Sequence, residues 1–247
     1  MCSCEGAEGP AKIIFRQFFE KESSTYTYLV GDEETREAVI IDPVDTTVDR
    51  DLSIAEELGL EIVYGVNTHA HADHVTGTSL LRDRIKAKKP ESTFKSVISS
   101  ASGAKADVTF NHGAKISFGK RFLEARLTPG HTAGCASLVL DDKSMVFTGD
   151  TLLVRGCGRT DFQEGSSETL YKSVHEQLYS LPDRCAVYPA HDYKGRTSST
   201  ILEEKRFNPR LGLSKKAEEF VGIMNNLNLS KPKLIDIAVP KNMNCGV

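Results

Sequence analysis

Three histidines and one aspartate lie within six positions of the segment Thr68-His69-Ala70-His71-Ala72-Asp73-His74, directly after the apolar run Ile62–Val66. Neutral imidazole and carboxylate groups are what borderline divalent metals bind in proteins. If a strand continues into the segment, His69 and His71 share one face, while Asp73 and His74 fall on a tightening loop that turns them toward the same point. The segment therefore predicts a metal site.

Further candidate ligands follow in three turn-like segments, Thr128-Pro129-Gly130-His131-Thr132-Ala133-Gly134, Thr148-Gly149-Asp150 and Tyr188-Pro189-Ala190-His191-Asp192. Five of the seven histidines of the chain belong to these segments or to the first one. The other two, His112 and His175, are expected to be surface or structural residues.

Composition limits the classes of function that the chain can have. With 247 residues, 39% of them apolar, it can bury the core of one large α/β domain. A net charge of −3 and the absence of long Lys/Arg runs argue against a nucleic-acid partner. No apolar stretch is long enough to span a bilayer and the mean hydropathy is −0.30, so we expect a soluble protein without a membrane partner.

The six cysteines are scattered and lack the C-x-x-C spacing of a zinc ribbon or redox motif, which favours a reducing compartment. Residues 1–11, with Cys2 and Cys4, are expected to form a flexible tail ahead of a single domain over residues 12–247. This tail does not look like a basic amphipathic transit peptide, which favours the cytosol.

The apolar and turn patterns predict strands that end at the candidate ligands, as Ile62–Asn67 does at the histidine segment. Other strands are expected over residues 12–19, 26–30, 38–41, 96–99, 122–127, 137–140, 145–147 and 185–188. Helices are expected from a cap at Asp49 to Gly59, and over residues 75–86, 168–179, 199–207 and 214–227. Because strands and helices alternate in two halves, we predict an α/β fold of the αββα type, with two sheets face to face and helices outside.

The motifs T-H-x-H-x-D-H, P-G-H-T-x-G, F-T-G-D and P-A-H follow one another in an order that closely resembles the metallo-β-lactamase superfamily, over residues 12 to about 192. This resemblance implies two metal subsites that share one aspartate as a bridge. Their ligands would be His69, His71 and His131 for one subsite, Asp73, His74 and His191 for the other, and Asp150 for the bridge.

Within that superfamily, the string D-T-L-L-V-R-G-C-G-R-T-D-F-Q, which starts at Asp150, is similar to the persulfide dioxygenases, also called sulfur dioxygenases or ethylmalonic encephalopathy proteins. Segments that start at Asp42, Asn225 and Ala238 extend the resemblance over nearly the whole chain. It implies one Fe(II) per chain, bound by His69, His131 and Asp150. Two histidines and one carboxylate are the ligand set of non-haem iron oxygenases.

The resemblance also implies the reaction, in which glutathione persulfide is oxidised by O₂ and water to sulfite and glutathione in hydrogen sulfide catabolism. Arg159, together with Arg155, would bind the carboxylates of the glutathionyl tail, unless Arg159 forms a structural ion pair with Asp161. Tyr193 would hydrogen-bond near the metal or, alternatively, pack at the end of its strand. Four further side chains would orient the ligands and bound water: His71, Asp73, His74 and His191.

Two other functions are alternatives. Glyoxalase II, a thioester hydrolase of the same fold, uses a dinuclear centre whose metal-bound hydroxide attacks an acyl carbon, and all of its ligand types are present here. The segment after His191 is shorter than the helical substrate-binding extension of that family, which favours the dioxygenase. The second alternative is a metal-bound binding or redox-sensing module whose cysteines carry the function, in which Cys157, beside Arg155 and Arg159, has a lowered pKa.

The ligand types alone leave the metal and the number of metal ions open, because iron, zinc and manganese all accept these side chains. A homodimer is expected because it is the commonest assembly of soluble enzymes. The resemblance implies the mitochondrial matrix as the location, with the cytoplasm as the alternative.

Overall fold

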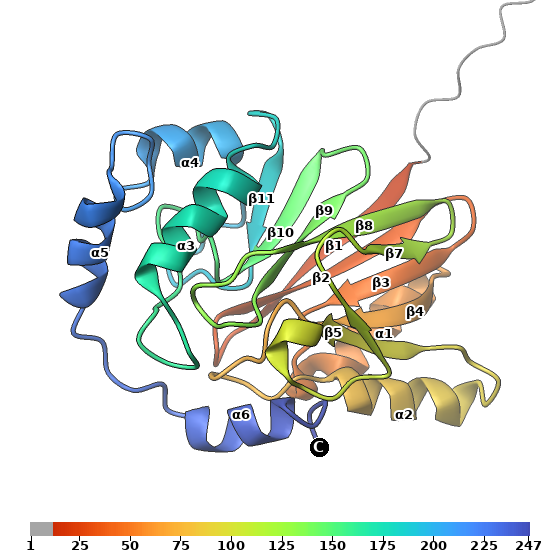
Figure 1. The fold of residues 1–247 in the computed structure, drawn as a ribbon. Helices are drawn as coiled ribbons and strands as arrows, with labels where there is room; N and C mark the ends of the chain where they lie inside the picture. Colours follow the sequence, from red (N-terminus) through yellow and green to blue (C-terminus); the bar gives the residue numbers. More distant parts are fainter. Residues whose placement is uncertain (1–11) are drawn as a thin grey trace, which may run out of the picture.

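Two six-stranded sheets pack face to face in the computed structural model, which describes residues 12–247 (Figure 1). The expectations for the N-terminal tail, Cys2 and Cys4 lie outside the described residues. The first sheet has the order β1-β2-β3-β4-β5-β6, with β1 Ile13–Glu20, β2 Thr25–Asp32, β3 Glu37–Ile41, β4 Glu61–Val66, β5 Lys95–Ser99 and β6 Val108–Phe110. The second has the order β12-β11-β10-β9-β8-β7, with β7 Lys115–Phe118, β8 Arg121–Leu127, β9 Ala136–Leu140, β10 Met145–Gly149, β11 Ala186–Pro189 and β12 Ser199–Thr200.

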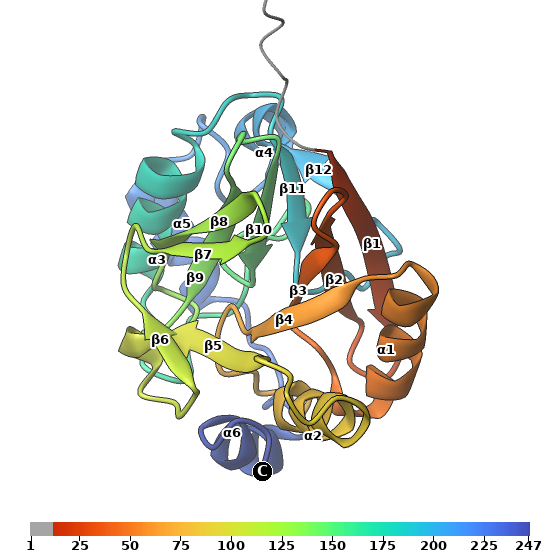
Figure 2. The same cartoon turned by 90° about the vertical axis from the view of Figure 1, so that its right-hand side faces the viewer.

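Helices cover the outer faces of both sheets, as two views at right angles show (Figures 1 and 2). Those beside the first sheet are α1 Val48–Glu57 and α2 Thr78–Lys88. Those beside the second are α3 Ser167–Ser173, which continues as a π-helical turn over Val174–Leu178, α4 Ile201–Phe207 and α5 Ala217–Asn225. The last helix, α6 Ile235–Asn242, lies at the bottom edge of the sandwich in both views. The predicted αββα fold is confirmed.

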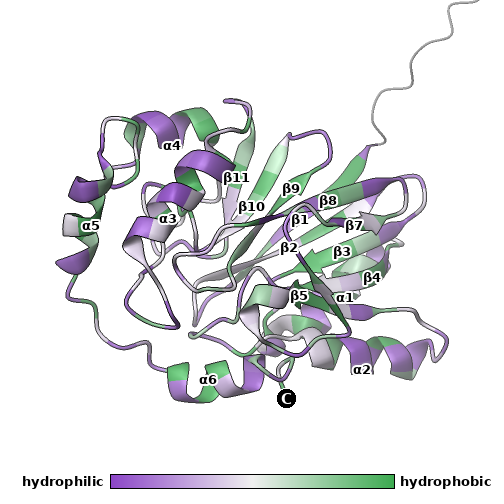
Figure 3. Cartoon of the chain, viewed as in Figure 1, coloured by the Kyte–Doolittle hydropathy of each residue, from purple (hydrophilic) through white to green (hydrophobic). Residues whose placement is uncertain are grey.

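The main core lies between the two sheets. Tyr28 from the first sheet and Phe118 and Phe147 from the second are fully buried there, and apolar residues dominate the strands while the helices carry polar residues outward (Figure 3). Burial of such large side chains contributes about 1.5–3 kcal/mol each. The two sheets are therefore fixed against each other, and the loops at their ends are held in place.

Strands β3, β4, β5 and β6 run parallel, joined by α1 and α2 as crossovers. Parallel strands have their carboxyl ends at one edge of the sheet, so the residues after β3 and β4 meet there. In the second sheet, β10 and β11 are also parallel, which places Asp150 and His191 at one edge as well. The predicted ligand segments therefore share one end of the sandwich.

Some element boundaries differ from the prediction. Helix α1 begins at Val48 without a side-chain cap, so Asp49 lies in its first turn. Helix α2 begins at Thr78 rather than at Val75, because the backbone of residues 75–77 bonds to other loops. Strands β6 and β7 and helix α6 were not predicted; α6 contains Pro240, which hides it in the sequence. Among the described residues, no helix has the length and apolar character needed to cross a membrane.

Candidate metal centre

The predicted ligands converge from four loops, those after β4, β8, β10 and β11, and they form two adjacent groups. In the first group, one ligand atom from each of His69, His131 and Asp150 lies within 4.8 Å of the others. The second group consists of His71, Asp73, His74 and His191, and its ligand atoms also lie within 4.8 Å of one another. The superfamily resemblance placed His71 with His69 and His131, whereas the structure groups it with the other three.

His131 presents Nε2 to the first group. Its Nδ1 lies 2.6 Å from the backbone oxygen of Arg159, which can only accept, so Nδ1 carries the proton. The lone pair of Nε2 is then free, 3.6 Å from Oδ2 of Asp150. A carbonyl partner on the far nitrogen is the usual way in which proteins orient a metal-binding histidine.

His69 has the same tautomer for a related reason. The hydroxyl of Thr68 donates to Oδ2 of Asp42 at 2.8 Å, so its oxygen must accept from His69 Nδ1, 2.9 Å away. Burial, together with the neighbouring rings of His71 and His131, holds the pKa of His69 well below its usual value. His69 is therefore a neutral ring whose Nε2 is free to bind a metal.

Asp42 and Thr68 are functional residues that the sequence reasoning missed as such. Besides its bond to the Thr68 hydroxyl, Asp42 accepts from the Thr68 backbone N–H at 2.7 Å and from His71 Nε2 at 3.1 Å. Its backbone φ of +49° is unusual for a residue other than glycine. A carboxylate at the end of a buried strand, before Pro43, was the available signal.

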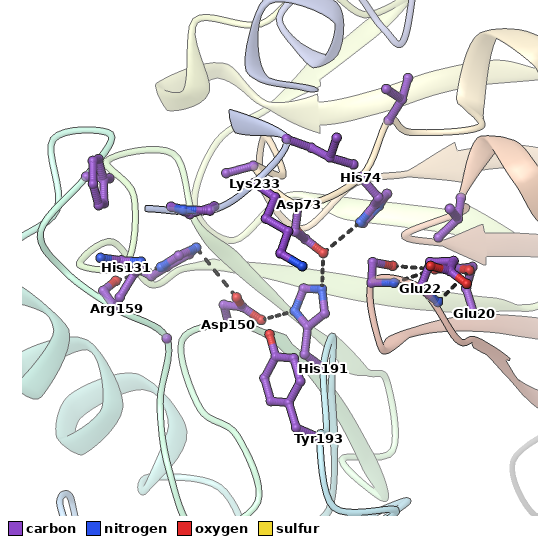
Figure 4. A pocket seen from close by; sticks show the side chains of 18 of the residues that line it. Glu20, Glu22, Asp73, His74, His131, Asp150, Arg159, His191, Tyr193 and Lys233 are labelled. Carbon is purple, nitrogen blue, oxygen red and sulfur yellow. Dashed lines mark hydrogen bonds and ion pairs between the residues drawn. The ribbon is translucent and has the colours of Figure 1, made fainter. Parts of the chain in front are cut away.

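His191 bridges two carboxylates (Figure 4). Its Nδ1 donates to Asp150 Oδ1 at 2.6 Å and its Nε2 to Asp73 Oδ2 at 2.8 Å. Burial alone would lower the pKa of His191, but the two carboxylates outweigh it and hold the pKa well above its usual value. Burial likewise opposes ionisation of Asp150 and Asp73, and the charge of His191 outweighs it and lowers both pKa values.

Two histidines of the second group each offer one free ring nitrogen. His71 donates from Nε2 to Asp42, and His74 lies 3.2 Å from Asp73 Oδ2 through Nδ1. Nδ1 of His71 and Nε2 of His74 are buried and have no hydrogen-bond partner. Buried polar atoms without a partner are rare and indicate a water or an ion.

A cavity of about 900 Å³ opens onto both groups. Arg159, Tyr193 and Lys233 line it, as do Glu20 at the end of β1 and Glu22 in the turn after it (Figure 4). No ion pair of Lys233 is found among the described residues, and its ammonium group points toward the metal-ligand groups. Lys233, Glu20 and Glu22 were not predicted, because nothing in their local sequence links them to the histidine motifs.

Arg159 lines the cavity and also forms the ion pair that the sequence analysis gave as its alternative role. Its guanidinium binds Asp161 through two hydrogen bonds of 2.6 and 2.7 Å. It also donates to the backbone oxygens of Leu229 and Ser230, at 3.3 and 2.6 Å. The ring of Tyr193 stacks on His191 with a centroid distance of 6.2 Å, and this tyrosine is 71% exposed toward the cavity mouth.

The structure does not bring Arg155 into the cavity lining. Its guanidinium forms ion pairs with Glu203, 2.6 Å away, and with the fully buried Glu204. Glu204 also accepts from Ser199 at 2.6 Å. The prediction that Arg155 binds substrate is therefore corrected, since its charge is already neutralised by α4.

Cys157 is buried, and burial raises the pKa of its thiol to about 11. The cation that contacts this sulfur is Arg210, with Nη1 4.0 Å from it. The predicted lowering of this pKa is therefore wrong, and with it the redox-sensing alternative loses its nucleophile.

His112 and His175 lie outside both ligand groups, as expected. His175 is half-buried and stacks on Tyr171 rather than lying on the surface.

Comparison with known proteins agrees with this geometry. A model of the metallo-β-lactamase superfamily matches residues 21–191. The mitochondrial persulfide dioxygenase ETHE1 of Mus musculus is 56% identical over 99% of this chain and 93% of its own length, and that of Homo sapiens is 57% identical over the same shares. The crystal structure of ETHE1 from Myxococcus xanthus matches with a TM-score of 0.88 and 51% identity, over 95% of this chain and 100% of its own.

A hydrolase relative is more distant. The cytoplasmic hydroxyacylglutathione hydrolase of Arabidopsis thaliana is 34% identical over 68% of this chain and 64% of its own length. The match to the mouse dioxygenase covers 99% of this chain and so includes the C-terminal segment, which the superfamily model does not reach. The chain thus belongs to the metallo-β-lactamase superfamily and, within it, to the family of persulfide dioxygenases.

Proposed function

We propose that this persulfide dioxygenase binds one Fe(II) through His69, His131 and Asp150 and oxidises glutathione persulfide to sulfite. The observation that carries the proposal is the arrangement of protons in the first ligand group. Thr68 and the Arg159 carbonyl occupy the Nδ1 atoms of the two histidines, so both Nε2 lone pairs and the Asp150 carboxylate remain for a cation. These residues fit a single metal ion with two nitrogen ligands and one oxygen ligand.

An Fe(II) ion held by His69, His131 and Asp150 would supply the redox chemistry that activates O₂. In the net reaction, the terminal sulfur of the persulfide gains both atoms of O₂ and one oxygen from water. Its bond to the glutathione sulfur breaks, so that glutathione leaves as the thiol. Sulfite and two protons are the other products, which balances the atoms and charges.

The protein's own groups position the reactants and control the charge around them. His191 is hydrogen-bonded through both ring nitrogens, and its Nδ1 lies 2.6 Å from Asp150 Oδ1. This bond fixes the direction of the carboxylate. Arg159 and Lys233 supply positive charge on the cavity wall, where we propose that they bind the carboxylates of the glutathionyl tail. Tyr193, stacked on His191, directs a hydroxyl toward the same cavity.

A second candidate function is thioester hydrolysis at a dinuclear centre. The unpartnered nitrogens of His71 and His74 favour it, because they offer lone pairs for a second cation. Against it, both ring nitrogens of His191, a ligand of that second cation, are occupied by carboxylates. The two functions differ in their need for O₂, which makes them separable.

The test measures O₂ uptake, sulfite release and thioester hydrolysis on one preparation whose iron and zinc contents are known. We expect iron-loaded protein to consume one O₂ for each sulfite formed from glutathione persulfide. Zinc-loaded protein should do neither. Background O₂ uptake by iron-replete protein, together with rapid cleavage of S-lactoylglutathione with or without air, would replace this proposal with the hydrolase.

We also propose a homodimer and a mitochondrial location. The names of the mouse and human relatives place those proteins in mitochondria. Light scattering that gives the mass of one chain, 27.1 kDa, would rule out the dimer. A tagged full-length protein that stays in the cytosol would rule out the location.

A further inference from the structure

Asn242, the last residue of α6, is bonded in three ways to the loop that carries the candidate ligands. Its side-chain NH₂ donates to the backbone oxygens of His71, at 2.9 Å, and of His74, at 2.8 Å. Its side-chain oxygen accepts from the backbone N–H of Thr76 at 2.8 Å. Asn242 is only 3% exposed, so water does not compete for these bonds.

The side chain of asparagine matches this place in a way that few others do. It offers two donors and one acceptor on a short planar group, and here both donors and the acceptor are used. The two carbonyls lie three residues apart, so the NH₂ group closes the turn from His71 to His74. Without it, two buried carbonyls and one N–H would lack partners, and burial makes such unpaired polar groups unfavourable.

The C-terminal turn holds Asn242 in place from its other side. The backbone N–H of Lys105 donates to the Met243 oxygen at 2.9 Å, which ties the end of α6 to the loop after β5. Gly246 packs so closely on Thr76 that a Cβ atom there would lie 2.3 Å from the Thr76 oxygen. Asn242 is therefore presented to the histidine loop by an anchored element.

The turn that Asn242 closes contains Asp73, whose Oδ2 accepts from His191 Nε2 at 2.8 Å. His191 in turn donates from Nδ1 to Asp150 Oδ1 at 2.6 Å. We infer that Asn242 is a positioning residue: it fixes the turn, and through Asp73 and His191 it fixes the direction of Asp150 toward the metal. This inference rests on the proposed ligand set and adds a residue 92 positions away from that aspartate to the machinery of metal retention.

The test compares Asn242→Asp with Asn244→Asp. The first change is isosteric and keeps an acceptor for the Thr76 N–H, but it places carboxylate oxygens against the carbonyls of the turn. The second makes the same chemical change two residues later, where the side chain of Asn244 is exposed and donates to the Pro240 oxygen at 3.1 Å. Asn242→Ala is included in case Asn242→Asp does not fold.

The readout is the rate at which the full chain, loaded with Fe(II) or with Co(II), releases its metal to a chelator, well below the unfolding midpoint of every variant. We expect Asn242→Asp to release metal at least about tenfold faster than the wild type, and Asn242→Ala to lie between them. The absorption bands of the Co(II) form should change in the Asn242 variants, because the direction of one ligand changes. Asn244→Asp should match the wild type in both measurements.

Folded Asn242 variants that have lower unfolding midpoints but release metal at the wild-type rate, with unchanged Co(II) bands, would show a purely structural role and overturn the inference. Failure of the proposed ligand set is a separate result, because His69→Ala would then keep its metal. Metal release also does not depend on which substrate the enzyme oxidises, so a failure of this inference can be distinguished from a failure of the proposed function.

Discussion

At the scale of single residues, the position of each imidazole proton decides which nitrogen can bind a metal. Thr68 and Asp42 place the proton of His69 on Nδ1, and the Arg159 carbonyl does the same for His131. Thr68 belongs to the first histidine motif, whereas Asp42 and Arg159 lie outside the histidine motifs. The tautomer that can bind a metal is thus set by residues that hydrogen-bond to the ligand histidines.

We predict that His69→Ala, His131→Ala and Asp150→Ala each lose the metal and at least about 100-fold in activity, because a three-ligand site keeps too few donors after one loss. Iron content by elemental analysis and O₂ uptake check this. His112→Ala is the control; it removes an exposed histidine outside both groups and should keep full iron occupancy. Full occupancy in any of the three ligand variants would overturn the ligand assignment.

The two neighbouring arginines should respond differently to the same substitution. Arg159→Lys should raise KM for glutathione persulfide more than it lowers kcat, because lysine keeps the charge but loses the planar fork. Arg155→Lys should leave KM unchanged and lower the unfolding temperature, because Arg155 pairs with the buried Glu204. Steady-state kinetics and thermal unfolding of both variants separate the two roles. An unchanged KM for Arg159→Lys would mean that Arg159 has only a structural role, in its ion pair with Asp161.

At the scale of elements, the ends of strands and helices place the chemistry, and the helices also carry buried charge. Asp51, in α1, is fully buried and accepts from Arg50 Nε at 2.8 Å. Burial raises the pKa of Asp51 to about 6, although Arg50 opposes the change. Ionised Asp51 in α1 therefore lowers the free energy of unfolding relative to its protonated form.

The pH dependence of this cost has a definite sign. Between about pH 4 and the folded-state pKa of about 6, the folded protein binds more protons at Asp51 than the unfolded chain does, so this residue's contribution to stability falls as pH rises. Above about pH 6 the Asp51 carboxylate is ionised in the folded and in the unfolded state, and its burial then destabilises the fold to the full extent. We predict that Asp51→Asn is about 1–3 kcal/mol more stable than the wild type at about pH 8.

The gain should shrink toward zero below about pH 4, where the wild-type carboxyl is neutral. Urea unfolding of both proteins at several pH values measures the difference. Asp49→Asn, on the same helix with a side chain 75% exposed, should change stability by less than about 0.5 kcal/mol at every pH. A gain for Asp51→Asn that is the same across this range would contradict the raised pKa.

At the scale of the whole molecule, the metal site joins the two sheets. His69 follows β4 of the first sheet, whereas His131 and Asp150 follow β8 and β10 of the second. A cation bound by all three links loops of the two sheets, in addition to polar contacts such as that of His191 with Asp73. Because the unfolded chain does not bring these loops together, metal binding stabilises the folded state.

Removal of the metal should therefore lower the unfolding temperature. At a free metal concentration about 100 times the Kd, binding stabilises the fold by about 2.7 kcal/mol, or several degrees for a chain of this size. Calorimetry of chelator-treated and iron-loaded protein measures the shift. Asp150→Ala should show no shift on metal addition; an equal shift in that variant would mean that the metal binds elsewhere.

The sequence by itself determined the ligand types, their order and the fold class. Ligand motifs such as the one from His69 to His74 are local, because the chemistry needs several donors on one short loop. The alternation of strands and helices likewise follows from hydrophobic period, which each segment carries alone. Ligand motifs and hydrophobic periodicity can be identified from the sequence alone because each depends on residues within one segment.

Only the tertiary structure decided the contacts between distant segments. Arg155 and Arg159 look alike in the sequence, yet Arg155 faces the carboxylates of α4 and Arg159 faces the cavity. Cys157 has basic neighbours along the chain but a buried thiol in the fold, so its pKa rises instead of falling. In the same way, Asn242 meets the histidine loop across 168 positions, and no local pattern marks it. Burial and charge depend on what packs against a side chain, and packing joins residues that the sequence keeps apart.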